Sequence, residues 1–415
     1  MNQITNYSNE RTVHVNPSLK KLLFLRYKPL LIFLSILVLG IYCFQTVNGI
    51  TAWKNNYQYF QSNDAIKDFE KQIEESYEFD DANGGQIFLY YNLKKEQAIY
   101  TSDFNKYKDY SLTVFNSKSD ANQQAYNSYA YYNEHFLIFL IIFVTSGVLL
   151  FLYDLKSNFT SALFSSKFKR SDIYRQKILL VGGVLAGSLF VGKIFSFICY
   201  HLLIPNHFFN ISIKQHLLST LSGWATLVSI FLLSSLIGIL FGDWLFGIGT
   251  IIVLFFTFSS FLSNIDLVYT TLFVDESKLP YTVSETALNQ VMPLNQTSTL
   301  KLNIVPLVFL ILAGILAYFL GKYLFNRISL EHSGDVILVP QISRIFQICM
   351  ILYIMIVVST PTIVITFFPA EALDTYEIAL NILIIAVTFI GVFLLSEFLL
   401  FNKKSKIINR LNFFA

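Results

Sequence analysis

A glycine-rich stretch is the first candidate for chemistry in this chain. Gly187, Gly192 and Lys193 have the GxxxxGK spacing of a loop that holds nucleotide phosphates. Ile194 stands at the next position, where such a loop needs Ser or Thr to hold Mg²⁺. The stretch also lies inside an apolar run rather than after a strand. We therefore expect no ATP site and no bound cofactor in this chain.

The lysine of this stretch is unusual for a different reason. Lys193 falls in the outer half of the apolar run 178–203, where a charge is costly unless it faces a cavity, a partner or water. Its side chain could line a substrate path and attract an anionic group. It could instead extend outward to the lipid headgroups. The sequence leaves both alternatives open.

Other reactive residues form no recognisable constellation. His201, His207 and His216 border the loop after this run, but their spacing fits no metal-ligand motif. No Ser-His-Asp arrangement or pair of buried carboxylates is apparent. The three cysteines all lie in apolar segments and do not form zinc-type pairs. We expect neither an enzyme nor a metal protein.

The elements that position these residues are mostly membrane spans. The chain is 54% hydrophobic and 14% charged, with a mean hydropathy of +0.53, which is typical of a membrane protein. Crossing a bilayer takes about 20 apolar residues in a helix. Such runs occur at 30–49, 136–153, 178–203, 217–241, 244–263, 304–325, 345–367 and 376–401. We predict an all-α polytopic membrane protein with about eight transmembrane helices.

The basic residues predict the orientation of these spans, because Lys and Arg concentrate in cytoplasmic segments. They crowd the arm 1–29, the segment 154–177 and the tail after Phe401, and two more, Arg327 and Arg344, mark the loop 326–344. Both termini are therefore expected on the cytoplasmic side of a plasma membrane. The composition is compatible with a bacterial one.

The N-terminal arm, 1–29, contains a basic amphipathic segment. Residues 16–28 predict a helix that lies in the membrane interface and ends before Pro29. The alternative is that these residues are only the basic flank of the first span, 30–49.

The largest polar segment, 50–135, carries more acidic than basic residues. It predicts a small extracellular α+β domain, with a helix at 64–79 and a second at 120–134. Short strands are expected at 86–92, 98–102 and 111–116.

The region 136–326 contains the second to sixth spans. Within it, the segment 154–177 lies between the second span, 136–153, and the third, 178–203. It carries six basic residues against two acidic ones: Lys156, Lys167, Lys169, Arg170, Arg175 and Lys177, with Asp154 and Asp172. Ser157 is expected to cap a short helix in which Phe159 pairs with Leu163, and Phe164 with Phe168. The two pairs fall on opposite sides of such a helix. One apolar face would rest on the spans, and the other would bind a partner.

Three rows of small residues predict close packing between helices, including a dimer seam. The rows are Gly183 and Gly187; Ser234, Gly238 and Gly242; and Ala313, Ala317 and Gly321.

This arrangement resembles the membrane subunit of an ABC transporter of the type-two exporter family. The resemblance covers roughly residues 16–326. It depends on the basic helix 16–28, the large outer loop, the inner segment LFSSKFKRSDIYRQK at 163–177 and the short inner turn at Gly242-Asp243. The family usually has six spans, so the region 327–415, with its cytoplasmic loop, two further spans and basic tail, is an addition.

The resemblance implies that residues 159–170 form a coupling helix that sits in a groove of a cytoplasmic ABC ATPase dimer. The ATPases would hold ATP and Mg²⁺, and a second permease subunit, identical or homologous, would complete the pore. Membrane lipid, but no nucleic acid, completes the expected partners. The residues expected to couple to the ATPase are Phe159, Leu163, Phe164, Phe168, Lys169, Arg170 and Arg175.

We therefore expect a permease that exports an amphipathic substrate, such as a peptide, an antibiotic, a toxin or a lipid-like molecule. The alternative is a membrane receptor or scaffold that binds a ligand through its outer domain without transport. An integral membrane enzyme is disfavoured, because Lys193 alone stands inside a span.

Overall fold

The computed structural model describes residues 17–79, 85–92, 97–115, 131–132, 136–273, 304–329, 335–368 and 374–401. Within these ranges, seven helices are long and apolar enough to cross a membrane. They contain seven of the eight expected spans. The eighth, 244–263, lies within the 30-residue helix α9 (Trp244–Phe273). The chain is thus mostly helical and multi-pass. The helix expected at 120–134 and the basic tail lie almost wholly outside the described residues.

Helix α1 (Pro17–Tyr59) runs unbroken through Pro29, so the prediction of a separate interfacial helix is wrong. A proline inside a helix removes one hydrogen bond and costs about 3 kcal/mol. The carbonyl that loses its partner is that of Leu25, on the exposed side of the helix. The opposite side carries one continuous buried stripe: Leu19, Leu23, Tyr27, Leu31, Leu34, Val38 and Tyr42. Packing of this stripe carries the helix across the proline.

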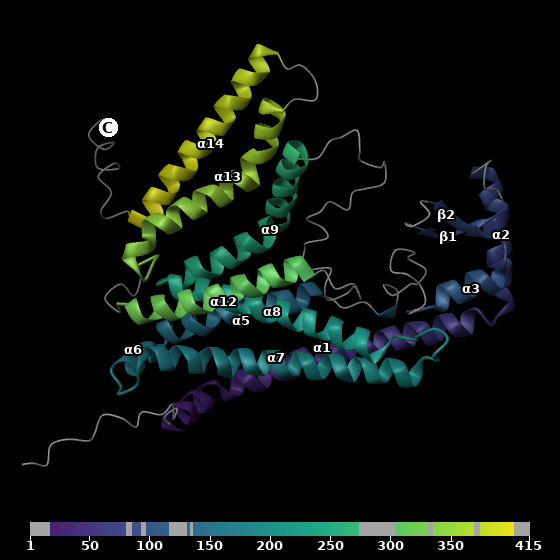
Figure 1. Cartoon of the computed structure of the whole chain (residues 1–415), viewed down its shortest axis with the longest axis horizontal. Coiled ribbons are helices and arrows are strands. Elements are labelled where there is room, and N and C mark those ends of the chain that lie inside the picture. Colours follow the sequence, from purple (N-terminus) through teal and green to yellow (C-terminus); the bar gives the residue numbers. More distant parts are fainter. Residues whose placement is uncertain are drawn as a thin grey trace, which may run out of the picture.

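Five helices form the part of the molecule that we call the bundle (Figure 1). These are α1, α5 (Phe136–Lys156), α7 (Arg170–Leu203), α8 (Ile213–Leu240) and α12 (Ile304–Arg327). Helix α8 packs against both α5 and α12, while α1 lies along α7. Buried residues such as Phe143, Val181 and Phe231 form their shared apolar core.

Small residues bring some of these helices close together. A Cβ on Gly238 would overlap the carbonyl oxygen of Val148 in α5, and one on Gly321 would lie 2.7 Å from the Tyr174 hydroxyl. The Ser234 hydroxyl is 3.5 Å from the Phe143 carbonyl.

The small residues of α7 differ from the expected row. Gly183 and Gly187 are exposed, with nothing within 4 Å of a Cβ. Their neighbour Gly182 faces Phe231, and Gly192 faces Tyr42. Small-residue spacing therefore located the helix but not the side that packs. The other expected row members also differ from one another, because Ala317 is buried, Ala313 is half-buried and Gly242 lies in the turn after α8.

The outer assembly follows α1 directly and contains α2 (Asn63–Phe79), β1 (Ile87–Asn92), β2 (Gln97–Thr101) and α3 (Phe104–Leu112). The two strands pair antiparallel, with an irregularity between Phe88 and Tyr90. The third expected strand, 111–116, is wrong, because it contains the end of α3 and a single bridge from Phe115 to Phe209.

A second apolar cluster fastens this assembly to the bundle. It joins Trp53 of α1, Leu112 of α3 and Tyr200 of α7 with the loop after α7. The Trp53 indole donates to the Leu112 carbonyl at 2.9 Å, and the Tyr131 hydroxyl donates to the Ser111 carbonyl at 2.9 Å. Burial raises the pKa of Tyr131, while a hydrogen bond from Asn56 opposes that shift. Its phenol therefore stays protonated and able to donate at neutral pH.

The remaining helices, which we call the arm, are α9, α13 (Ser343–Phe367) and α14 (Thr375–Phe401). Helix α13 continues through Pro361, which has no N–H to bond the carbonyl of Val357. The side-chain amide of Asn264, in α9, donates to that carbonyl at 2.9 Å and to the Ile356 carbonyl at 2.8 Å. A neighbouring helix therefore satisfies the group that the proline leaves open.

Candidate functional site

The ends of several bundle helices meet on one side of the molecule, which we call the cationic end (Figure 1). Helix α5 ends there, α7 begins there, and α12 ends beside the start of α7. The short helix α6 (Phe159–Phe164) connects α5 to α7. Exposed basic residues gather around it: Lys20, Lys21, Arg26, Lys28, Lys156, Lys167, Lys169 and Arg327.

Helix α6 is shorter than the expected coupling helix and starts differently. Its N-cap is Asn158 in the left-handed conformation, with φ 56°, and no side chain caps the helix. The prediction that Ser157 is the cap is therefore wrong. The Ser157 hydroxyl accepts a hydrogen bond from Arg26 at 2.9 Å instead. Phe168 lies beyond the helix end, so its expected helical pairing with Phe164 does not form.

The aromatic residues of this segment face the bundle rather than solvent. Leu163 is buried, and Phe159, Phe164 and Phe168 are half-buried against the bundle core. Phe164 meets Phe325 of α12 with ring centroids 5.4 Å apart. The prediction of a free apolar face is therefore wrong. The exposed residues from this segment are Lys156, Ser157, Asn158, Ala162, Ser165, Lys167, Lys169 and Asp172.

Arg170 fixes this segment to the end of α12. Its guanidinium lies 4.2 Å from the ring centre of Phe164 and donates to the carbonyls of Asn326 at 3.1 Å and Ile328 at 2.8 Å. A cation is well placed there, because the last carbonyls of a helix have no partner within the helix. Of the other expected coupling residues, Lys169 is exposed and Arg175 is half-buried on α7.

A buried polar group joins three bundle helices next to α6. Lys177 of α7 and Asp154 of α5 form an ion pair at 2.5 Å, and both side chains are fully buried. The hydroxyl of Tyr27, on α1, donates to the same carboxylate oxygen. Its place in the basic run predicted that Lys177 would add to the basic surface. Lys177 instead neutralises Asp154 inside the bundle.

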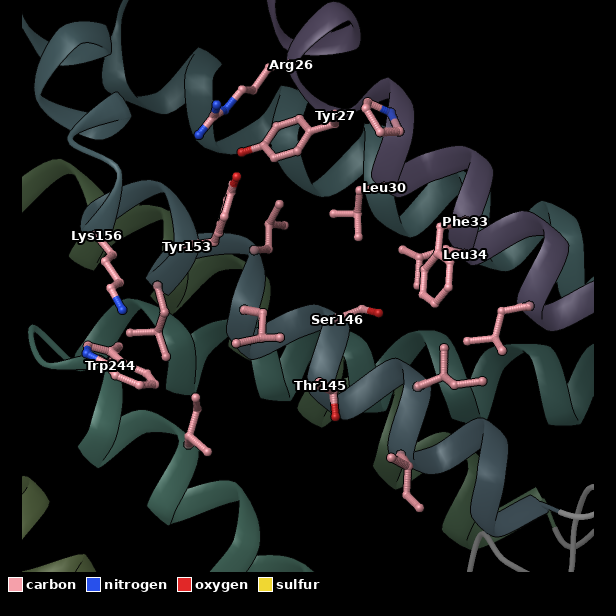
Figure 2. Close-up of a pocket in the computed structure, with 18 residues that line it drawn as sticks. Arg26, Tyr27, Leu30, Phe33, Leu34, Thr145, Ser146, Tyr153, Lys156 and Trp244 are labelled. Carbon is pink, nitrogen blue, oxygen red and sulfur yellow. The ribbon is translucent and has the colours of Figure 1, made fainter.

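A groove of about 640 Å³ opens beside this group, between α1 and α5 (Figure 2). Leu30, Phe33 and Leu34 of α1 point into it across from α5, and Thr145 and Ser146 of α5 add two hydroxyls. We call it the α1–α5 groove. The remainder of its wall is mainly apolar, with Ile142, Leu149 and Leu150 from α5 and Ile248 from α9. Its volume is in the range of small-molecule sites.

Two cations lie at the mouth of this groove on facing helices (Figure 2). Aromatic rings orient both of them. Arg26 lies 5.1 Å from the ring centres of Tyr153 and Phe159, and the Lys156 ammonium lies 3.8 Å from that of Trp244. Arg26, Lys156 and Trp244 were not among the predicted site residues. In the sequence, Arg26 had a signal as part of the basic arm and Lys156 as a member of the basic run, whereas Trp244 had none.

Lys193 lies in a different part of α7, in a buried polar cluster. Its side chain is only 2% exposed, so the alternative that it reaches the headgroups is wrong. On the neighbouring helix α8, His216 is also buried, and its ring is stacked 4.0 Å from that of Phe197 of α7. The hydroxyls of Thr46 and Ser196 bond each other nearby at 2.8 Å. A role in a substrate path stays a prediction.

In the part of the chain that the structure describes, no three His, Cys, Asp or Glu side chains come together as a metal site. His207 instead lies 3.8 Å from Asp109 at the surface.

Comparison with known proteins gives no family for this chain: no family model, curated protein or solved structure matches it. The geometry therefore defines a class, a multi-pass helical membrane protein with a cationic end.

Proposed function

We propose that this chain is the permease subunit of an ATP-driven ABC exporter and that α6 receives the movement of a separate ATPase. The observation that carries the proposal is the position of α6. One side of it is fixed to the bundle by aromatic packing, and the exposed residues on it and just before and after it, within 157–169, are small, polar or cationic. A polar outer face suits a soluble partner better than lipid.

The contacts around α6 support a rigid connection from this helix into the membrane. Arg170 ties its C-terminal side to α12, and the Tyr27–Asp154–Lys177 group ties α5 to α1 and α7. A push on α6 would therefore move several spans together rather than one loop. Such movement of packed elements is a common way to open or close a path. Driving it requires an ATPase that binds one of the two states more tightly.

We further propose that the cationic end is cytoplasmic, since basic residues concentrate on that side of membranes. In this orientation both termini lie on the cytoplasmic side of a plasma membrane, and the small α+β assembly lies on the extracellular side. The chain then crosses the membrane eight times, with α9 included. The exported substrate would be amphipathic, because the path would be bordered by apolar helices and a cationic end.

The test is purification of the full chain from its own membrane together with any bound ATPase. The decisive variant is Lys167→Glu/Lys169→Glu, which reverses two exposed charges beside α6 without touching the bundle core. We expect ATPase recovery, and ATP hydrolysis by the complex, to fall at least about tenfold, because reversed charges oppose a complementary partner.

The matched control is Lys21→Glu/Lys28→Glu, which makes the same charge change on the exposed side of α1. It should keep both the ATPase and its activity. Wild-type chain that exports amphipathic peptides or antibiotics from vesicles with no ATPase attached would refute the proposal, as would equal loss from both double variants.

A further inference from the structure

We propose that the α1–α5 groove binds an anionic phospholipid from the leaflet at the cationic end, with its phosphate between Arg26 and Lys156. The proposal needs the chain to lie in a membrane but does not depend on transport. Its failure would therefore leave the proposed coupling to an ATPase untouched.

The length of the groove matches one leaflet. On α1 the lining runs from Arg26 to Leu37, eleven steps along the helix, or about 17 Å at the rise per residue. The hydrocarbon of one leaflet is about 15 Å thick, half of a bilayer core. Cations at one end and an apolar wall of this length reproduce the polarity of a single phospholipid molecule.

Among the residues that the structure describes, no carboxylate pairs with the two cations at the mouth, Arg26 and Lys156. Asp154, on the same helix as Lys156, is engaged by Lys177 and Tyr27. Arg26 uses one nitrogen on Ser157, which leaves donors for a phosphate. An anion from outside the chain fits this local excess of positive charge.

The groove can be entered from the bilayer. Leu30, Phe33, Leu149 and Tyr153 line it and are each exposed, so its side is open where acyl chains would surround the helices. Tyr153 and Trp244 stand at the mouth beside the two cations, where aromatic residues with a polar group commonly meet lipid headgroups.

Other occupants fit less well. The chain's own N-terminal segment, 1–16, has one acidic residue, Glu10, next to Arg11, and the C-terminal tail is basic. Neither offers the negative charge that the mouth lacks. The acidic helix α2 belongs to the outer assembly, away from the cationic end (Figure 1). A second copy of α1 would place like charges against Arg26.

The experiment measures lipid retention by purified, delipidated full-length chain. Native mass spectrometry after titration with dioleoylphosphatidylglycerol, and separately with dioleoylphosphatidylcholine, reports the affinity of each. We expect wild type to hold one phosphatidylglycerol more tightly than phosphatidylcholine. Arg26→Gln/Lys156→Gln should weaken phosphatidylglycerol binding about 30-fold, since each cation near anionic headgroups contributes roughly fivefold.

Two further variants separate this site from general attraction to anionic lipid. Lys21→Gln/Lys28→Gln removes the same charge from the exposed side of α1 and should leave the tight phosphatidylglycerol unchanged. Ser146→Trp fills the groove without changing charge and should displace it. Equal retention of both lipids by wild type, equal weakening by the two charge variants, or full retention after Ser146→Trp would each overturn the proposal. Recovery of a peptide from the groove would do the same.

Discussion

The bundle and the arm differ in what their helices bury. In the bundle, large apolar side chains fill a shared core, and the Asp154–Lys177 pair is fully buried. In the arm, five of the six buried residues of α13 are polar, and those of α14 are Ser396 and Glu397. The apolar residues of α14 are mostly exposed, and none of them is buried.

The difference shows two ways of joining helices that an apolar solvent surrounds. Lipid removes the hydrophobic drive between helices, so close packing or polar contacts must hold them together. The bundle uses close packing at glycines such as Gly238, together with the buried Asp154–Lys177 ion pair. The arm uses hydrogen bonds: Arg344 and Gln347 of α13 both contact Glu397 of α14. The following variants test this contrast, from the largest expected effect to the smallest.

The first variant, Asp154→Asn, should destabilise the bundle most, because it leaves Lys177 buried without a counter-ion. We expect a loss of about 3–5 kcal/mol in the free energy of unfolding, measured by denaturant titration in detergent micelles. The double variant Asp154→Leu/Lys177→Met should recover most of it, since an apolar pair removes the stranded charge. If the double variant is no more stable than the single one, the unpaired charge of Lys177 is not the cause of the destabilisation. Asp64→Asn, at the exposed pair with Lys67, serves as a control and should change nothing measurable.

The second comparison places one methyl group in each region. Gly238→Ala would push against the backbone of α5 and should cost about 3 kcal/mol, the upper end for overpacking. Gly391→Ala, in α14, meets nothing within 4 Å and should be neutral or stabilising by up to about 1 kcal/mol, because Ala favours helix. Thermal unfolding of both variants checks this order. A harmful Gly391→Ala would mean that α14 packs closely against another helix.

The third variant, Glu397→Gln, tests the polar joint of the arm. The carboxylate is 1% exposed and lies 2.6 Å from the Arg344 guanidinium, which is itself 59% exposed. We expect a loss of about 2 kcal/mol, as for a hydrogen bond to a charged group. Hydrogen exchange should rise in α13 and α14 while α5 and α8 stay protected. Uniform loss of protection would contradict a separate arm.

The fourth variant concerns the proline in α13. Asn264→Leu removes the donor to the Val357 carbonyl and should cost about 1 kcal/mol, because hydrogen bonds between spans are modest. In a Pro361→Ala background the same change should cost less, because the new N–H satisfies that carbonyl within the helix. Equal costs in both backgrounds would show that Asn264 does not act by satisfying the carbonyl that Pro361 leaves open.

The sequence predicted the helices well, because a span needs a long apolar run and little else. Seven expected spans lie in long apolar helices, and the expected positions of α2, β1 and β2 are confirmed to within a residue or two. Prolines were a poor guide to where the helices end. Pro29 and Pro361 both lie inside continuous helices, since packing or a neighbour's side chain compensated for the lost hydrogen bond.

The site was harder to predict, because its contacts join residues far apart in the chain. The basic run revealed the cationic end, but nothing local distinguishes Lys177, paired with Asp154, from Lys167, which is exposed. The aromatic spacing of the segment suggested a free apolar face, whereas Phe325, some 160 residues later, covers Phe164. The α1–α5 groove depends on how α1, α5 and α9 meet, and local periodicity does not encode that.

Helix α1 is much longer than a single membrane span requires. Its 43 residues span about 65 Å as a helix, more than twice the thickness of the hydrocarbon layer. Helix α1 carries Tyr27 at the cationic end and Trp53 in the second apolar cluster. A tilt of this helix about a point between the two residues would move Trp53 in the direction opposite to Tyr27. A ligand that held Trp53 still would, by the same geometry, resist that tilt and restrain the far end of the helix.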